Sequence, residues 1–347
     1  MKYRYRPQRN YGCRINDLYT YKGLDTVVLE NDLVRISVLA GKGTDIYEYV
    51  YKPTGLDYMW LSSGGVQNPS EYLPTSPDPI STMIDYYSGG WQVVFPNGGP
   101  SSVYQGAQFG QHGEVLHMPW DWEIVEDTEE RISVRFSVYT KKVPFHVTRT
   151  MTLERNSPSL WIEEEIENLC AFPQQYMWGQ HLAYGKPFVE PGCRIRLPEG
   201  TLVVTESTDS PISPPGRVLR GEPQNWPITR APNGTSTDLS VLPEMGAPSD
   251  ICYLTNFKES AWYEIENPRL GIGFRVEWDA ATLPYLWYWQ EFGATTDYPW
   301  YGRHYNIGLE PFAGYPTWGL SEAIRNGSAG KIGPYEKKRL WLRTSPF

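Results

Sequence analysis

The sequence predicts an all-β protein, a large antiparallel β-sandwich, from alternating apolar residues, closely spaced turns and many aromatic residues. Apolar and polar residues alternate in the segments 131–140, 146–154 and 269–278, and Leu340 and Leu342 continue the pattern near the end. A period of two gives each strand one apolar face for a core. No sustained run has helical periodicity, so two packed sheets are the expected architecture.

Turn signals such as Lys52-Pro-Thr-Gly and Pro96-Asn-Gly-Gly separate these segments. No change in composition divides the chain into two cores, so residues 1–347 are expected to form a single domain. One segment differs, because eight prolines fall between 205 and 250. Proline is excluded from central strands, and a long irregular excursion is therefore expected there.

Composition excludes several classes of protein. The net charge is −9 and there is no long Lys/Arg cluster, which argues against nucleic acid or an anionic membrane as partner. The four scattered cysteines indicate reduced thiols, and with no apolar run behind the basic start the expected location is cytoplasmic. The motifs for phosphate loops, dinucleotides, zinc proteases and serine hydrolases are absent, so no cofactor and no metal are expected.

Three of the five histidines lie in settings that suit chemistry. His112 lies in a Gly-flanked turn, His181 directly follows a strand-like run, and His304 precedes the apolar segment that leads to Glu310. Histidine suits proton transfer near neutral pH. A structural role for each remains the alternative, as does a weakly specified metal site from His112, His117 and a carboxylate.

Glu310 follows an apolar segment and is expected near the interior, where a carboxylate is rare without a salt bridge or a function. Aromatic residues cluster nearby in sequence and suit the C–H faces of sugars, although a plain aromatic core is the simpler explanation for any one of them. We expect His112, His181 and Glu310 to converge on one open cleft that binds a sugar ring.

The chain resembles the aldose 1-epimerases, and especially the divergent galactose mutarotase-like proteins, over residues 25–345. The resemblance rests on short motifs in a common order: Leu29–Leu39, Gly41-Lys-Gly43, Lys52–Asp57, His112-Gly113, His181 before Leu182-Ala-Tyr184, and Gly308-Leu-Glu-Pro311 followed by Gly314 and Pro316. It implies the supersandwich fold of that family and an isomerase that interconverts the α and β anomers of an aldose or an aldose derivative.

The resemblance also implies roles. Glu310 would be the general base at the anomeric hydroxyl, His181 the general acid at the ring oxygen, and His112 a hydrogen-bonding partner that helps hold charge there. The expected substrate-binding residues are Trp178, Gln180, Trp91, Gln92, Trp287, Trp289, Glu291, Arg303 and His304.

The chain departs from the family pattern in two places. Segment 89–97 lacks the Arg found upstream of the first histidine in typical members, and Glu291 is the candidate for a missing substrate-binding Asp. Two alternatives stay open: a non-catalytic carbohydrate-binding protein, and a glycan hydrolase or lyase using Glu310 and Glu291. The expected partner is a small sugar, with the protein a monomer or homodimer.

Overall fold

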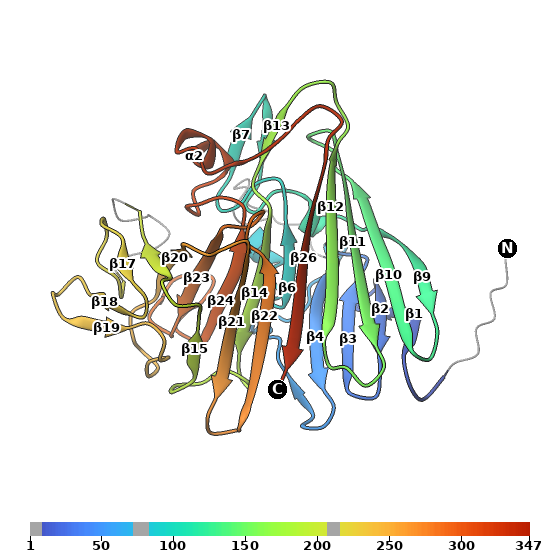
Figure 1. The fold of residues 1–347 in the computed structure, drawn as a ribbon, viewed down its shortest axis with the longest axis horizontal. Coiled ribbons are helices and arrows are strands. Elements are labelled where there is room, and N and C mark those ends of the chain that lie inside the picture. Colours follow the sequence, from blue (N-terminus) through green and yellow to red (C-terminus); the bar gives the residue numbers. More distant parts are fainter. Residues whose placement is uncertain (1–8, 72–82, 207–215) are drawn as a thin grey trace.

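The computed structural model describes residues 9–71, 83–206 and 216–347. Two large antiparallel sheets dominate this part of the chain (Figure 1). The first sheet has 12 strands and the second has 8 among the described residues. The predicted all-β sandwich is therefore confirmed.

The first sheet is described by its strands in spatial order. They are β1 (Arg14–Tyr21), β2 (Leu24–Glu30), β3 (Val34–Leu39), β4 (Asp45–Tyr51), β6 (Trp91–Val94), β14 (Gly179–Gly185), β24 (Asn306–Phe312), β23 (Tyr285–Glu291), β20 (Asp250–Thr255), β16 (Leu202–Val204) and β17 (Gln224–Asn225), with β5 (Leu56–Asp57) paired to β4.

The second sheet covers one face of the first. Its order is β15 (Arg194–Arg196), β21 (Ser260–Asn267), β22 (Ile272–Asp279), β26 (Lys337–Pro346), β12 (Leu160–Asn168), β11 (Phe145–Glu154), β10 (Arg131–Tyr139) and β9 (Asp121–Asp127).

Several short elements lie outside the two large sheets. They are the hairpin of β7 (Ser102–Tyr104) and β8 (Ala107–Phe109), the pair β13 (Gln174–Tyr176) and β25 (Gly330–Ile332), the hairpin of β18 (Ile228–Arg230) and β19 (Ser236–Asp238), a 3-10 turn η1 (Val115–His117) and the helix α2 (Leu320–Arg325).

The strands predicted from alternation match the structure closely. Segment 131–140 forms β10 and segment 146–154 forms β11. Segment 269–278 begins instead with a turn, because Gly271 has φ +66° and the strand β22 starts at Ile272. Leu270 is consequently exposed rather than part of the core.

The two sheets are joined across the core by apolar packing and by a few buried polar contacts. Tyr184 of β14 and Tyr263 of β21 share a hydrogen bond of 2.7 Å between their hydroxyl groups. Within the second sheet, the fully buried Arg149 of β11 and Glu164 of β12 form an ion pair with Nε and Oε1 3.1 Å apart, and Glu164 accepts a hydrogen bond from Gln180 of β14 in the first sheet. These contacts lie behind β14, the strand that carries His181.

The proline-rich excursion predicted at 205–250 is more regular than expected. Its residues 207–215 lie outside the described residues, but the remainder contains β17, β18 and β19. In Figure 1 these strands lie at the opposite end of the molecule from β1 and β9.

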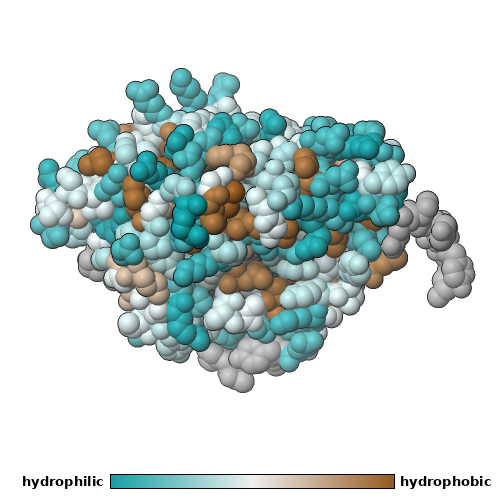
Figure 2. Space-filling view, turned by 90° about the horizontal axis from the view of Figure 1, so that it is seen from below, coloured by the Kyte–Doolittle hydropathy of each residue, from teal (hydrophilic) through white to brown (hydrophobic). Residues whose placement is uncertain are grey.

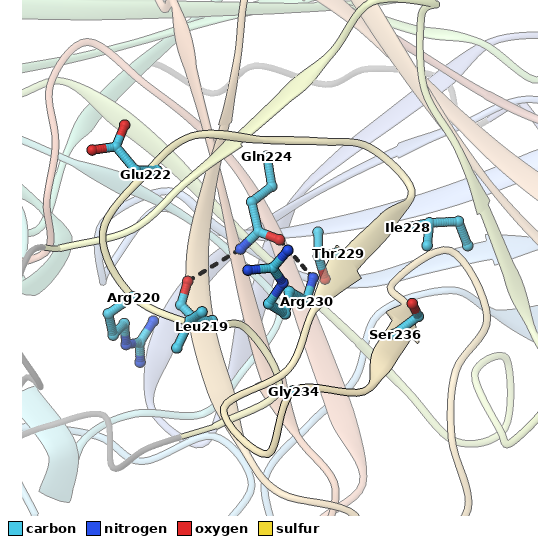
Figure 3. A pocket seen from close by; sticks show the side chains of 9 residues that line it. All are labelled: Leu219, Arg220, Glu222, Gln224, Ile228, Thr229, Arg230, Gly234 and Ser236. Atoms are coloured by element: carbon cyan, nitrogen blue, oxygen red, sulfur yellow. Dashed lines mark hydrogen bonds between the residues drawn. The ribbon is translucent and has the colours of Figure 1, made fainter.

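The excursion surrounds an open cavity of about 600 Å³ (Figure 3). Gln224 crosses it, donating to the carbonyl of Leu219 and accepting from the amide of Arg230. The cavity is lined by Leu219, Arg220, Glu222, Gln224, Ile228, Thr229, Arg230, Gly234 and Ser236. None of these is a candidate site residue.

The face of the molecule in Figure 2 is largely hydrophilic, with apolar residues in small separate patches. In the described ranges, no helix has both the length and the apolar character required to cross a bilayer.

Candidate active site

His181 and Glu310 face each other on neighbouring central strands of the first sheet. The register of β14 and β24 pairs Ala183 with Gly308. His181 precedes Ala183 by two residues and Glu310 follows Gly308 by two, so in this antiparallel register they stand opposite each other on the same face. His181 Nε2 and Glu310 Oε1 are 3.7 Å apart, close enough for electrostatic coupling but too far for a direct hydrogen bond.

Glu310 is held in an apolar environment with little room to move. Gly308 leaves space for the carboxylate, because a Cβ added there would lie 2.2 Å from Glu310 Oε1. Trp287 of β23 is the direct cross-strand neighbour on the other side. Burial raises the pKa of Glu310 well above its usual value, since desolvation penalises the charged form.

His181 lies between Glu310 on one strand and Gln92 on the other. The register of β6 and β14 pairs it directly with Gln92. Burial lowers the pKa of His181 to about 4, which favours the neutral imidazole. Its Nδ1 is buried and has no hydrogen-bond partner among the residues the structure describes.

His112 reaches the same site from a loop. The ring centroids of His112 and His181 are 5.2 Å apart in an edge-to-face arrangement. The loop is fixed by two reciprocal hydrogen bonds, in which the amide of Gly99 donates to Nδ1 of His112 and the amide of His112 donates to the Gly99 carbonyl. Because Nδ1 accepts, the proton of the neutral ring is on Nε2, which can donate to a ligand. Burial lowers the pKa of His112 well below its usual value.

Tyr87 is the centre of an aromatic cluster over this pair. Its ring centroid lies 5.3 Å from that of His181. Trp60, Trp289 and Trp300 contact it at centroid distances of 6.2, 6.3 and 6.1 Å. The contacts with Trp289 and Trp300 are edge to face and the contact with Trp60 is tilted. Together the rings present apolar walls of the kind that sugar rings contact.

The predicted convergence of the three residues agrees with this geometry, but the predicted open cleft does not. Only 5% of His112, 6% of His181 and 2% of Glu310 is exposed. Tyr87, itself 6% exposed, and the indoles beside it shield the pair from solvent. The sequence could not indicate this cover, because it is built from segments distant in the chain.

A buried polar group adjoins the pair and was missed from the sequence. Lys42 Nζ lies 2.6 Å from Asp45 Oδ2, and both side chains are essentially inaccessible. Gln92 Nε2 donates to the same Asp45 oxygen at 3.0 Å. Since Gln92 is the cross-strand neighbour of His181, this ion pair extends the polar face of the site towards β4.

The structure does not bring Trp178, Gln180 and Trp91 to this face. Gln180 is adjacent to His181 in a strand, so its side chain points to the opposite face, between the two sheets. There it donates to Glu164 at 2.8 Å and accepts from the Trp91 indole at 2.8 Å. The Trp178 indole also donates to Glu164, at 2.9 Å.

The remaining sequence-predicted residues fall at different places around the site. Trp287 lies beside Glu310 on the same face of the sheet, where it is buried and stacked on Phe312 at 3.8 Å between ring centroids. His304 joins the aromatic cluster, with its ring 5.4 Å from that of Trp60. Arg303 is exposed and lies over the Tyr301 ring at 5.7 Å.

Glu291 is buried, and its carboxylate already accepts hydrogen bonds from Ser249 and from the backbone of Gly293. Trp287 pairs with Glu310, and Glu291 lies four residues further along β23, which is about 13 Å at the usual rise per residue. This is a separation between backbone positions, whereas the distances that distinguish glycosidases are measured between carboxyl groups. A hydrolase that used Glu310 and Glu291 would first have to release the Glu291 carboxylate from its present hydrogen bonds.

In the described ranges, no group of three or more His, Cys, Asp or Glu side chains has a geometry that could hold a metal ion.

Gly308→Ala tests whether the position of the Glu310 carboxylate matters for function. The φ angle at Gly308 lies outside the left-handed region, and the three atoms nearest to the new methyl group all belong to the Glu310 side chain. We expect the variant to fold normally and to lose about 10- to 100-fold in turnover of a bound sugar, because small displacements of a reacting group are costly. Circular dichroism and anomer-exchange rates would check this, and unchanged rates would show that the carboxylate position is unimportant.

Comparison with solved structures identifies the fold. A candidate aldose 1-epimerase from Klebsiella pneumoniae matches with a TM-score of 0.72 and 15% identity, covering 96% of this chain and 82% of its own. A galactose mutarotase-like protein from Clostridium acetobutylicum matches with a TM-score of 0.65 and 13% identity, covering 97% and 99%. Another, from Lactobacillus casei, has a TM-score of 0.60 and 14% identity, covering 93% and 100%.

The chain thus has the galactose mutarotase-like fold, as the resemblance in its sequence implied. Residues 21–345 match the model of the family described as "Domain of unknown function (DUF4432)", and the chain belongs to that family. A search of curated proteins gave no match.

Proposed function

We propose that the protein is an isomerase that interconverts the α and β anomers of an aldose by acid–base ring opening. The observation that carries the proposal is the buried pair of His181 and Glu310, with Nε2 and Oε1 3.7 Å apart. The fold, which it shares with proteins described as candidate aldose 1-epimerases, supports a sugar as ligand. The aromatic cluster around Tyr87 supplies the apolar walls that such a ligand needs.

The reaction needs one group that accepts a proton and one that donates a proton. Glu310 removes the proton from the anomeric hydroxyl, the C1–ring oxygen bond breaks, and His181 protonates the ring oxygen. Rotation about the C1–C2 bond and reclosure through the reverse transfers give the other anomer. His112, with its proton on Nε2, donates a hydrogen bond that stabilises charge at the ring oxygen.

The buried environment suits this exchange. Desolvation makes an ionised Glu310 a stronger base and a protonated His181 a stronger acid than either is in water. The active form of His181 and Glu310 holds one proton between the two side chains. Either side chain can carry that proton before the sugar binds. The bound sugar must also displace part of the aromatic cover over the pair, because so little of either residue is exposed.

The pH dependence follows from the two pKa shifts. Below about pH 4, His181 and Glu310 are both protonated, no base is available, and the rate falls. At high pH the pair loses its last proton, and the rate falls again. Because burial raises the pKa of Glu310, this second fall lies well above the pH at which a glutamate ordinarily titrates. We expect a bell-shaped kcat/KM profile with a broad plateau, measured by anomer exchange. A rate that rises steadily with pH would instead indicate catalysis by hydroxide alone.

Anomer-exchange NMR over a panel of aldoses, including acidic and phosphorylated ones, tests the proposal directly. We expect exchange of at least one sugar to be far faster with protein than in buffer. If no sugar exchanges faster but one still binds, the protein is a carbohydrate-binding protein on the same fold.

A further inference from the structure

Three buried polar atoms beside the His181–Glu310 pair lack hydrogen-bond partners in the part of the chain that the structure describes. They are the hydroxyl of Tyr87, Oδ1 of Asp45 and Oε1 of Gln92. Buried polar atoms are nearly always paired, so an unpaired group that adjoins a candidate site requires an explanation. Three such atoms gathered from two segments, β4 and the stretch from Tyr87 to Gln92, point to a ligand that supplies the missing hydrogen-bond partners.

The three side chains are linked to one another and to the pair. Gln92 is the cross-strand partner of His181 and donates through Nε2 to Asp45. Tyr87 contacts the His181 ring, and the charges of Glu310 and Asp45 both raise the pKa of its hydroxyl, as does burial. Tyr87 therefore stays protonated and acts as a hydrogen-bond donor, while the free oxygens of Asp45 and Gln92 act as acceptors.

The group carries no net charge. Lys42 neutralises Asp45 at 2.6 Å with both side chains buried, so the ion pair has no excess charge to offer an anionic group. A donor next to two acceptors complements the hydroxyl groups of a sugar, each of which both donates and accepts. A phosphate or carboxylate would place uncompensated charge beside Asp45 in a desolvated environment, which is unfavourable.

We propose that Tyr87, Asp45 and Gln92 form a subsite that binds ring hydroxyl groups next to the anomeric centre, so that the substrate is a neutral aldose with free hydroxyls there. The inference rests on the proposed function and adds the substrate class. It assigns to Tyr87 direct contact with the sugar, in addition to its packing against His181.

Tyr87→Phe removes the hydroxyl while keeping the ring, and it should be measured with a series of aldoses that each lack one hydroxyl group. We expect the wild-type kcat/KM to fall about 10- to 100-fold when the recognised hydroxyl is absent, as expected for a lost hydrogen bond that leaves a buried group unpaired. Tyr87→Phe should lower kcat/KM for the parent sugar by a similar factor. It should show no further loss with the one deoxy sugar that lacks its partner.

Tyr58→Phe is the matched control. Its hydroxyl is also buried without a partner among the described residues, but its ring packs against Phe188 and Phe274 in the core of the sandwich. Both variants remove an unpaired hydroxyl and should change thermal stability alike. Only Tyr87→Phe should change the response to deoxy sugars.

Gln92→Met gives a second, independent measurement, since it keeps the length of the side chain and leaves Lys42 beside Asp45. Gln92→Met should have the same kcat/KM for the parent sugar and for the deoxy sugar that lacks the hydroxyl bound by Gln92. Equal responses of wild type, Tyr87→Phe and Gln92→Met to every deoxy sugar would overturn the subsite and leave the isomerase proposal intact. Failure of the wild type to accelerate exchange of any sugar would overturn the proposed function, and this inference with it.

Discussion

Glu310→Gln is expected to abolish anomer exchange while the sugar still binds. The amide has nearly the same shape as the carboxyl group but cannot accept the anomeric proton. Loss of one proton-transfer partner costs about 10²- to 10⁴-fold in rate. Exchange NMR would measure the rate, and calorimetric titration with the same sugar would measure binding.

The stability of this variant provides an internal check. Burial raises the pKa of Glu310, which means that the folded state is penalised whenever the carboxylate is ionised. Replacing it by an amide should therefore leave the unfolding free energy unchanged or raise it. Glu163→Gln, on the exposed side of β12, serves as a control that should change neither property. An active Glu310→Gln protein would rule out Glu310 as the base.

Much of the fold could be predicted from the sequence because the strands of the second sheet alternate clearly. The segment around Phe136 has one buried and one exposed face, and a period of two identifies such strands. The central strands of the first sheet gave a weaker signal, since every residue of β14 and β24 is buried. The helix α2 has only six residues, too few to show a helical period.

The site was predictable in part, and the errors have a common cause. Residues adjacent in a strand point to opposite faces, so nearness in sequence to His181 wrongly favoured Gln180 and Trp178 as wall residues. The same rule favours Trp287 and Trp289 as wall residues. Trp287 is opposite Glu310, and Trp289, two residues further along the strand, points to the same face. Asp45 and Tyr87 carried no local signal, because only the folding together of distant segments places them beside His181.

Arg149→Met is expected to have the largest effect on stability. Arg149 and Glu164 are both fully buried, with Nε and Oε1 3.1 Å apart between the two sheets. Removing only the arginine leaves a charged carboxylate in the core, which costs about 3–5 kcal/mol of unfolding free energy. Urea denaturation would measure the loss, and Arg35→Met, which breaks a half-exposed ion pair on β3, should cost at most about 1 kcal/mol.

The loss in Arg149→Met should depend on pH in a defined direction. Burial already raises the pKa of Glu164, and the arginine is the main influence that lowers it, so the variant raises that pKa further. A carboxyl whose folded pKa exceeds its unfolded value destabilises the folded state at high pH, and the penalty disappears as pH falls towards the unfolded value of about 4.3. The difference in unfolding free energy between wild type and Arg149→Met should therefore shrink as the pH is lowered from 8 to 5.

A second change should restore most of the stability at neutral pH. Glu164→Gln added to Arg149→Met removes the isolated charge but keeps an oxygen that can accept from the Trp178 indole or from Gln180. Arg149→Met should also slow anomer exchange, because the network supports β14 from behind the face that holds His181, and the double variant should restore the rate. If the double variant is no more stable than Arg149→Met, packing of the arginine against Trp91, rather than neutralisation of Glu164, is what the core requires.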